Sequence, residues 1–166
     1  ERAATMPEGP ERQRLLTFVL VGGGFAGIET IAEVRSLVSA MLKDYPTISF
    51  DETQFHLVEA MDRIMPEVSL PTSHWVLKNL AERGVTIHME TQLQSAVDGV
   101  CELSSGDKIE ADTIVVAVGA SPRELDSAKP DGERILTWKQ LYDLPAIPDH
   151  LIVVGSGVTG AEFASA

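Results

Sequence analysis

The sequence predicts an α/β fold, in which helices flank a central parallel sheet and a small antiparallel meander is added to it. Apolar runs at residues 15–21 and 113–118 each stop at a glycine. Runs of this kind are typical of strands buried on both faces of a parallel sheet. After the first run, apolar residues recur at helical spacing from Ala26 to about Leu42. Strand and helix therefore alternate, as they do in α/β domains.

The remaining elements follow in order along the chain. Further strands are expected at 54–59 and 85–89, and a helix at 71–83 whose buried side holds Trp75, Leu77, Leu80 and Ala81. Short extended pieces at 94–97, 100–103 and 108–110 are separated by Asp98-Gly99 and Ser105-Gly106-Asp107, which are hairpin signals. A short helix is expected at 138–142, and a strand at 151–154 that leads into another helix.

Composition excludes several classes of protein. The 166 residues include 25 acidic and only 13 basic side chains, giving a net charge of −12, which disfavours nucleic-acid binding. Cys101 is the sole cysteine, so an internal disulfide or a CxxC pair is excluded. The sequence shows neither a membrane-length apolar run nor a secretion signal. We expect a soluble, cytoplasmic protein.

A glycine motif joins the first expected strand to the first expected helix. Gly22, Gly24 and Gly27 match G-x-G-x-x-G, with Gly23, Phe25 and Ala26 at the variable positions. In this motif the first glycine permits the tight turn, the second lets a pyrophosphate approach the backbone, and the third lets helix and strand pack closely. The pyrophosphate then lies at the helix N-terminus, where free N–H groups favour negative charge. The context predicts dinucleotide binding, and an empty glycine turn without a ligand is the alternative.

The same motif recurs 133 residues later. Gly155, Gly157 and Gly160 repeat the three glycines, with valine before them, and Glu162 repeats Glu29 in register. We therefore expect the following organisation: a linker or arm at 1–14, a dinucleotide-binding domain of Rossmann type at 15–120, a connector at 121–150, and the start of a second dinucleotide-binding unit at 151–166.

An acidic residue ends the second expected strand. Glu59 is placed to bind the adenosine ribose hydroxyls, and its carboxylate would repel a 2′-phosphate, which favours NADH over NADPH. Arg63, four residues on, weakens that preference. The alternative is that Glu59 only ends a solvated strand.

The histidines and the cysteine give no support for a metal-binding or catalytic site. No pair of histidines has the sequence spacing of metal ligands, and Cys101 is expected to be a buried small hydrophobe. No catalytic or metal-binding residue is predicted.

Two pairs of segments resemble FAD/NAD(P)-dependent pyridine nucleotide-disulfide oxidoreductases. LTFVLVGGGFAGIE (16–29) and HLVEAMDRIMPE (56–67) make residues 11–118 similar to the NADH-binding domain of type II NADH dehydrogenases. TIVVAVGASPR (113–123) and DHLIVVGSGVTGAEF (149–163) make residues 113–166 similar to the disulfide-reductase branch, such as dihydrolipoamide dehydrogenases and quinone reductases. The chain reads as a mosaic of the two.

The resemblance implies roles for single residues. In these families a glutamate two positions after the last glycine is typical of an NAD site, so Glu29 and Glu162 imply NAD at both turns. Gly119 and Pro122 would shape a strand end beside the dinucleotide. The redox-active C-x4-C of the family is missing after Gly27, which excludes dithiol chemistry. The sequence also lacks the C-terminal segment that contacts the flavin in this family.

The implied function is that of a fragment of a flavoprotein oxidoreductase, natural or chimeric, that binds NADH for hydride transfer to FAD. The alternatives are a non-catalytic dinucleotide-binding module and the FAD-binding half of a disulfide-reductase-like flavoprotein. The expected partners are the dinucleotide, the remainder of the flavoprotein, a quinone-like electron acceptor and a second copy in a homodimer. A full-length relative is expected to be cytoplasmic or peripheral at the inner membrane face. We expect 15–120 to fold as a unit and 121–166 to pack opportunistically.

Overall fold

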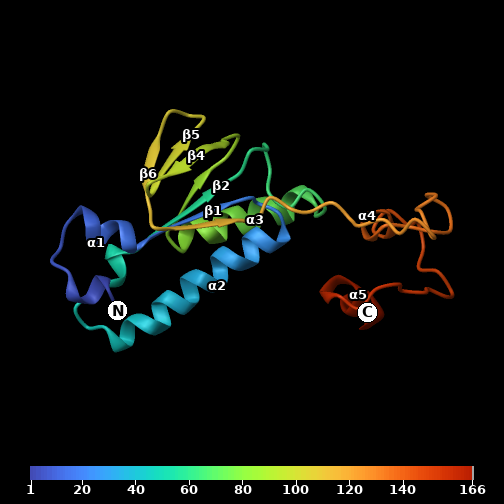
Figure 1. Cartoon of the computed structure of the whole chain (residues 1–166), viewed down its shortest axis with the longest axis horizontal. Coiled ribbons are helices and arrows are strands. Elements are labelled where there is room, and N and C mark those ends of the chain that lie inside the picture. The colour runs from blue at the N-terminus through green and yellow to red at the C-terminus, as the bar shows by residue number, and fades with distance from the viewer. Residues whose placement is uncertain (166) are drawn as a thin grey trace. The chain divides into compact units, whose positions relative to one another are not determined.

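The computed structural model describes residues 1–165 and contains two compact units, Glu1–Gly119 and Ala120–Ala166 (Figure 1). The first unit holds every strand of the described residues. Its elements are η1 Ala3–Thr5, α1 Pro10–Leu15, β1 Thr17–Val21, α2 Phe25–Met41, η2 Leu42–Asp44, η3 Phe50–Glu52, β2 Gln54–Val58, α3 Leu70–Glu82, β3 Val85–His88, β4 Leu93–Val97, β5 Val100–Leu103, β6 Lys108–Glu110 and β7 Thr113–Val116. The second unit holds α4 Trp138–Leu141 and α5 Val158–Ser165.

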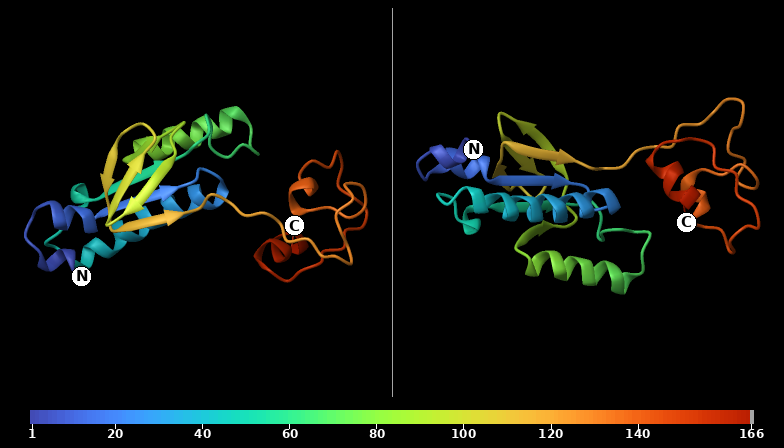
Figure 2. Two further views of the ribbon diagram at one scale, coloured as in Figure 1. Left: turned by 45° about the horizontal axis from the view of Figure 1, so that its top comes forward. Right: turned by 90° about the horizontal axis from the view of Figure 1, so that it is seen from below.

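The central sheet is parallel and has the strand order β3-β2-β1-β7. Val21 at the end of β1 pairs with Val58 of β2 and with Val116 of β7, so the carboxyl ends of these strands meet at one edge. Helices α2 and α3 cover one face, and the antiparallel sheet β4-β5-β6 covers the other (Figure 2). This is the predicted α/β fold with its added meander.

Two cores form because successive side chains of a strand point to opposite faces. Toward the helices, Leu20, Phe55 and Leu57 pack in one cluster with Ile28 and Ile31 of α2. On the other face, Val19, Val21 and Val58 pack in a second cluster with residues of the meander, including Cys101 and Leu103. Both faces of β1 and β2 are thus covered, which is why these strands are almost continuously apolar.

The segment expected as a linker, residues 1–14, contains α1 and is held to the sheet unit. Arg12 is only 6% exposed and pairs with Glu52 at 2.8 Å. Its guanidinium also donates to the carbonyls of Met6 at 3.1 Å and Thr47 at 2.5 Å. The polar, proline-containing sequence misled the prediction because the partners that order it lie 35 and 40 residues away.

Helix α3 uses a different buried stripe from the one expected. Leu80 is buried and Leu77 half-buried, as predicted, but Trp75 is 66% exposed and Ala81 is exposed. The fully buried residue of the first turn is Ser73, which shares a face with Leu77 and Leu80 because residues three and four apart are neighbours on a helix. Assigning Trp75 to the core by its size was wrong.

The second unit lacks the strand expected at 151–154. Helices α4 and α5 form as predicted, but the residues before α5 are not paired in a sheet, and Ile152 is 88% exposed. A strand exists only where a neighbour accepts and donates its backbone hydrogen bonds, and the described residues of this unit offer none to 151–154. The apolar run alone therefore does not make a strand.

Candidate functional site

The first glycine turn connects β1 to α2 at the carboxyl edge of the sheet. At two of its glycines, a side chain would overlap neighbouring backbone atoms. Gly22 has φ +113°, and a Cβ there would overlap the carbonyl oxygen of Ala117, which follows β7. A Cβ on Gly27 would overlap the carbonyl oxygen of Gly22 and approach Leu20 of β1. These contacts let strand, turn and helix pack without side chains between them, as predicted for the first and third glycines.

Gly24 differs because it faces open space. It is the N-cap of α2 with extended backbone, no side chain caps the helix there, and a Cβ would meet no atom within 4 Å. The first N–H groups of a helix have no intrahelical acceptor. The turn therefore presents free N–H donors beside an open position, which suits an anionic group at a helix N-terminus.

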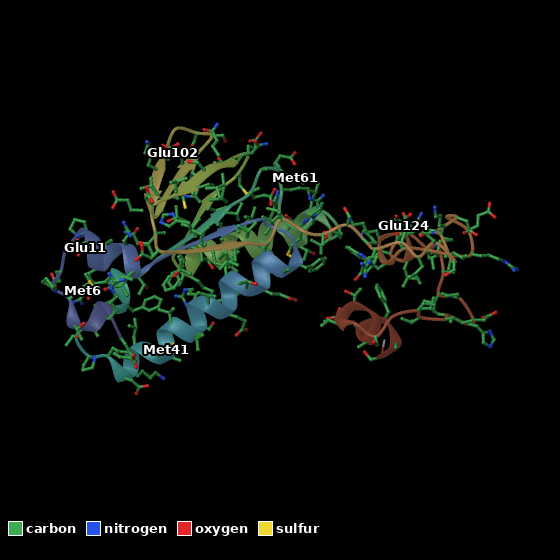
Figure 3. The ribbon with its side chains drawn as sticks, viewed as in Figure 1. Met6, Glu11, Met41, Met61, Glu102 and Glu124 are labelled. Carbon is green, nitrogen blue, oxygen red and sulfur yellow. The ribbon has the colours of Figure 1, made fainter. Side chains whose placement is uncertain are left out.

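Glu59, directly after β2, reaches the turn with its carboxylate. Its Oε2 accepts the N–H of Gly23 at 2.5 Å, and its Oε1 accepts the N–H of Met61 at 2.7 Å, while the residue is only 9% exposed. Met61 is labelled in Figure 3. A carboxylate has about four acceptor positions, so two stay available to hydroxyl donors. The structure thus brings the carboxylate of Glu59 to the glycine turn.

Arg63 lies in the same loop but turns its guanidinium into it. It donates to the carbonyl oxygens of Met65 and Val68, and its Nε is buried without a partner. The side chain therefore braces the loop that follows β2. It is bound to neutral carbonyl groups and not to an acidic side chain.

Four further candidates around the first turn lie on the surface. Phe25, Ala26 and Glu29 in the first part of α2 are exposed. Gly119, beyond β7, has φ +87°, which favours glycine, and a Cβ there would meet open space. Their assignment to a cofactor remains a prediction.

The second glycine turn repeats the local geometry of the first within its own unit. Gly155 has φ +127°, and a Cβ on Gly160 would overlap the carbonyl oxygen of Gly155. Gly157, like Gly24, faces open space. Glu162 is exposed on α5. The repeat seen in the sequence is thus a repeat in backbone conformation as well.

The structure brings together two histidines that their spacing along the sequence did not reveal. Nδ1 of His56 on β2 and Nε2 of His88 on β3 lie 3.1 Å apart. Burial, and then the charge of His88, lower the pKa of His56 from 6.5 to about 4. Both histidines belong to the set of alternate residues that face the meander, and this shared face is the signal that spacing along the chain did not reveal.

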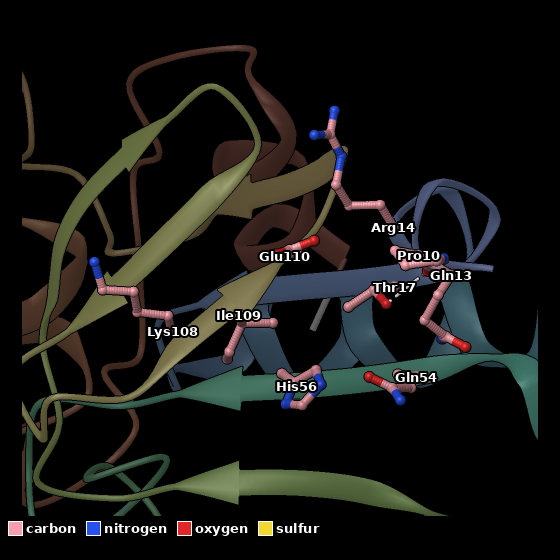
Figure 4. Close-up of a pocket in the computed structure, with 9 residues that line it drawn as sticks. All are labelled: Pro10, Gln13, Arg14, Thr17, Gln54, His56, Lys108, Ile109 and Glu110. Atoms are coloured by element: carbon pink, nitrogen blue, oxygen red, sulfur yellow. Dashed lines mark hydrogen bonds between the residues drawn. The ribbon is translucent and has the colours of Figure 1, made fainter.

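His56 also lines a pocket of about 270 Å³, with residues of α1, β6 and the amino ends of β1 and β2 (Figure 4). Since the glycine turn lies at the carboxyl ends of those strands, this pocket is separate from that turn. Cys101 is fully buried, as expected, and burial raises the pKa of its thiol.

Among residues 1–165, none of the helices combines the length and the apolar character needed to cross a membrane.

Comparison with known proteins places the chain among oxidoreductases. It is 68% identical over 72 residues to an NAD(P)H dehydrogenase (quinone) of Mycobacterium tuberculosis, covering 43% of this chain and 14% of that protein. It is 33% identical over 143 residues to a dihydrolipoyl dehydrogenase of Chlorobaculum parvum, covering 82% of this chain and 30% of that protein. The chain thus spans less than a third of either relative.

Solved structures share the fold. NDH2 from Plasmodium falciparum, solved in complex with NADH, superposes with a TM-score of 0.64 at 18% identity, over 71% of this chain and 26% of that one. The family profile described as pyridine nucleotide-disulphide oxidoreductase matches residues 2–132 and again residues 100–166, so each match includes one glycine turn. The chain belongs to the pyridine nucleotide-disulphide oxidoreductases, which are flavoproteins with Rossmann-type nucleotide-binding folds.

Proposed function

We propose that the glycine turn at 22–27 binds the adenosine diphosphate half of NADH, and that the complete protein is an NADH dehydrogenase-like oxidoreductase. The observation that carries this proposal is the open position at Gly24 beside the carboxylate of Glu59. The helix N-terminus at Gly24 supplies donors for the pyrophosphate, and Glu59 supplies acceptors for the ribose hydroxyls. Both parts of the ligand are thereby met by groups of matching chemistry.

The preference for NADH over NADPH follows from charge. A 2′-phosphate on the adenosine ribose would approach the Glu59 carboxylate and be repelled by it. Arg63, the nearby cation, donates to the carbonyl groups of Met65 and Val68 and so stays directed into its own loop. A site that accommodates a 2′-phosphate needs a free arginine in this place.

The same cradle suits the adenosine diphosphate half of FAD, because that group also has an unphosphorylated ribose. A flavin, when bound, supplies the group that accepts hydride from NADH. The residues of this chain bind and orient: the backbone of the turn holds pyrophosphate, Glu59 holds ribose, and Glu29 contacts the carboxamide side of the nicotinamide. Gly155, Gly157, Gly160 and Glu162 provide the second dinucleotide site. The remaining partners we propose are the rest of the flavoprotein and a quinone-like acceptor.

The test is a fluorescence titration of the 166-residue chain with NADH, followed by competition with NADPH and FAD. We expect saturable NADH binding at least tenfold tighter than NADPH binding, since a like charge at the ribose costs more than one factor of ten. FAD binding in place of NADH would reassign the turn to the flavin. Binding of none of the three would refute the proposal.

Two variants identify which turn binds. Gly24→Val and Gly157→Val occupy equivalent open positions, and in neither does the new Cβ meet an atom within 4 Å, so both are expected to fold. Gly24→Val should abolish NADH binding at the first turn because its side chain fills the pyrophosphate position, and any NADH binding that remains then belongs to the second turn. Gly157→Val should leave the first site unchanged. The reverse pattern would move the NADH site to the second turn.

A further inference from the structure

The loop that begins at Glu59 is hydrogen-bonded to the glycine turn. Both backbone groups of Gly23 are bonded to this loop: its N–H donates to Oε2 of Glu59 at 2.5 Å, and its carbonyl accepts the N–H of Met65 at 2.8 Å. Ile64 lies between these two contacts and is fully buried. A Cβ on Gly23 would come within 2.7 Å of the Ile64 side chain, so loop and turn touch directly.

A hydroxyl on α3 fixes this loop in turn. Oγ of Ser73 donates to the carbonyl of Ile64 at 2.9 Å, and Ser73 is fully buried. A buried hydroxyl is costly unless it is bonded, so its presence in the apolar stripe of α3 calls for an explanation. The bond to Ile64 supplies one, because it pins the residue between the two contacts with Gly23.

We propose that Ser73 is a positioning residue for the ribose-binding carboxylate and the pyrophosphate turn. The inference rests on the proposed function and deepens it. Ser73 holds the Ile64 carbonyl, Ile64 and Met65 hold Gly23, and Gly23 holds the carboxylate of Glu59. Ser73 touches no ligand itself. It sets the distance between the acceptors for ribose and the donors for pyrophosphate, which a dinucleotide must meet together.

The experiment compares ADP with 2′,3′-dideoxy-ADP by calorimetric titration of the 166-residue chain. The two ligands differ only in the ribose hydroxyls, so their ratio of dissociation constants reports the contribution of Glu59. The variants are Ser73→Ala, Ser73→Cys and Val85→Ala. Val85 is buried in the same core cluster as Ile64 but begins β3, at the amino ends of the strands, so its variant lowers stability without touching the loop that follows Glu59.

We expect wild type to bind ADP more tightly than the dideoxy compound. Ser73→Ala should reduce the ratio of the dissociation constant of dideoxy-ADP to that of ADP about three- to tenfold, the usual effect of one lost hydrogen bond. Ser73→Cys keeps the shape with a weak donor and should fall between the two. Val85→Ala should keep the wild-type ratio even where its melting temperature falls.

Equal ratios in wild type and both Ser73 variants would overturn the positioning role while leaving the proposed function intact. Should Ser73→Ala not fold, Ser73→Cys decides by the same ratio. A wild-type chain that binds neither compound would refute the proposed function, and the inference with it.

Discussion

At the scale of the residue, Glu59, which we propose binds ribose, shows how the backbone orients a carboxylate. Each carboxylate oxygen accepts one N–H, from Gly23 or from Met61. The carboxylate is therefore oriented before any ligand arrives, which reduces the entropy lost on binding. It also retains acceptor positions for two hydroxyls.

Replacing Glu59 by Gln tests this arrangement. The amide keeps the shape but removes the charge, and its NH₂ group faces a backbone N–H donor where an acceptor was needed. We expect NADH affinity to fall about tenfold, the range of a lost charge-assisted hydrogen bond, while the discrimination against NADPH shrinks because the repelling charge is gone. Competition titrations with both nucleotides measure this. Glu33→Gln on the exposed side of α2 is the control, and it should keep both the affinity and the discrimination.

His56 predicts how stability depends on pH. Its pKa is about 4 in the folded chain, below the ordinary 6.5, because burial and His88 disfavour its charged form. Between these values the unfolded chain binds more protons, so the free energy of unfolding should fall as pH decreases through this window, by about 1–2 kcal/mol because solvent screens this partly exposed side chain. Urea unfolding of wild type near pH 7.5 and near pH 5 measures the loss.

The matched variants for that measurement are His56→Gln and His74→Gln. His56→Gln should lose less stability than wild type over the same interval, since the titrating group is removed. His74 is exposed on α3, and its variant should follow wild type. A variant of His56 with the full wild-type loss would assign the pH dependence to other groups.

At the scale of the element, sequence reasoning succeeded where a pattern is local. Strands β1, β2, β3 and β7 were predicted from short apolar runs, and α2 from its helical spacing. The glycine turn was predicted from its motif between a strand and a helix, and the contact that requires Gly27, with the carbonyl of Gly22, lies within a few residues. These features depend on neighbours in the sequence, so the sequence displays them.

Other elements depend on distant partners and were not predictable. The residues 151–154 have the composition of a strand, yet no neighbouring strand pairs with them among the described residues. The His56–His88 contact requires the register of β2 and β3, and the role of Ser73 requires the position of Ile64. Each of these depends on a tertiary contact that no local pattern encodes.

Helix α1 gives a prediction at this scale. Arg12 is buried and joins α1 to the segment around Thr47 and Glu52. Arg12→Ala should lower the free energy of unfolding by about 3 kcal/mol. The change leaves the Glu52 carboxylate and the backbone carbonyls that Arg12 bonds without their donor. Arg14→Ala is the control: Arg14 pairs with Asp112 at 2.6 Å but is 37% exposed, so its loss should cost less than about 1 kcal/mol. Equal losses in the two variants would contradict the anchoring role of Arg12.

At the scale of the whole molecule, the chain carries two glycine turns in two units with different surroundings. The first turn is built into a sheet with two buried cores. The second precedes α5 in a unit where Ile147 is 96% exposed and residues 151–154 are unpaired. Apolar exposure of this extent is typical of a surface that another part of a protein covers. The two turns therefore differ in support although their backbone geometry is alike.

Hydrogen exchange should separate the two units. Amides of β1 and β2 lie in the interior of a hydrogen-bonded sheet with both faces covered, so they should exchange only by global unfolding. Amides of 120–157, with few buried contacts, should exchange within seconds, and proteases should cleave there first. The measurement is peptide-resolved exchange of the 166-residue chain with and without NADH. We expect NADH to slow exchange in 22–30 and 59–65 and to leave residues 120–150 unchanged. If 120–157 were as protected as β1 without ligand, the two units would fold as one cooperative structure.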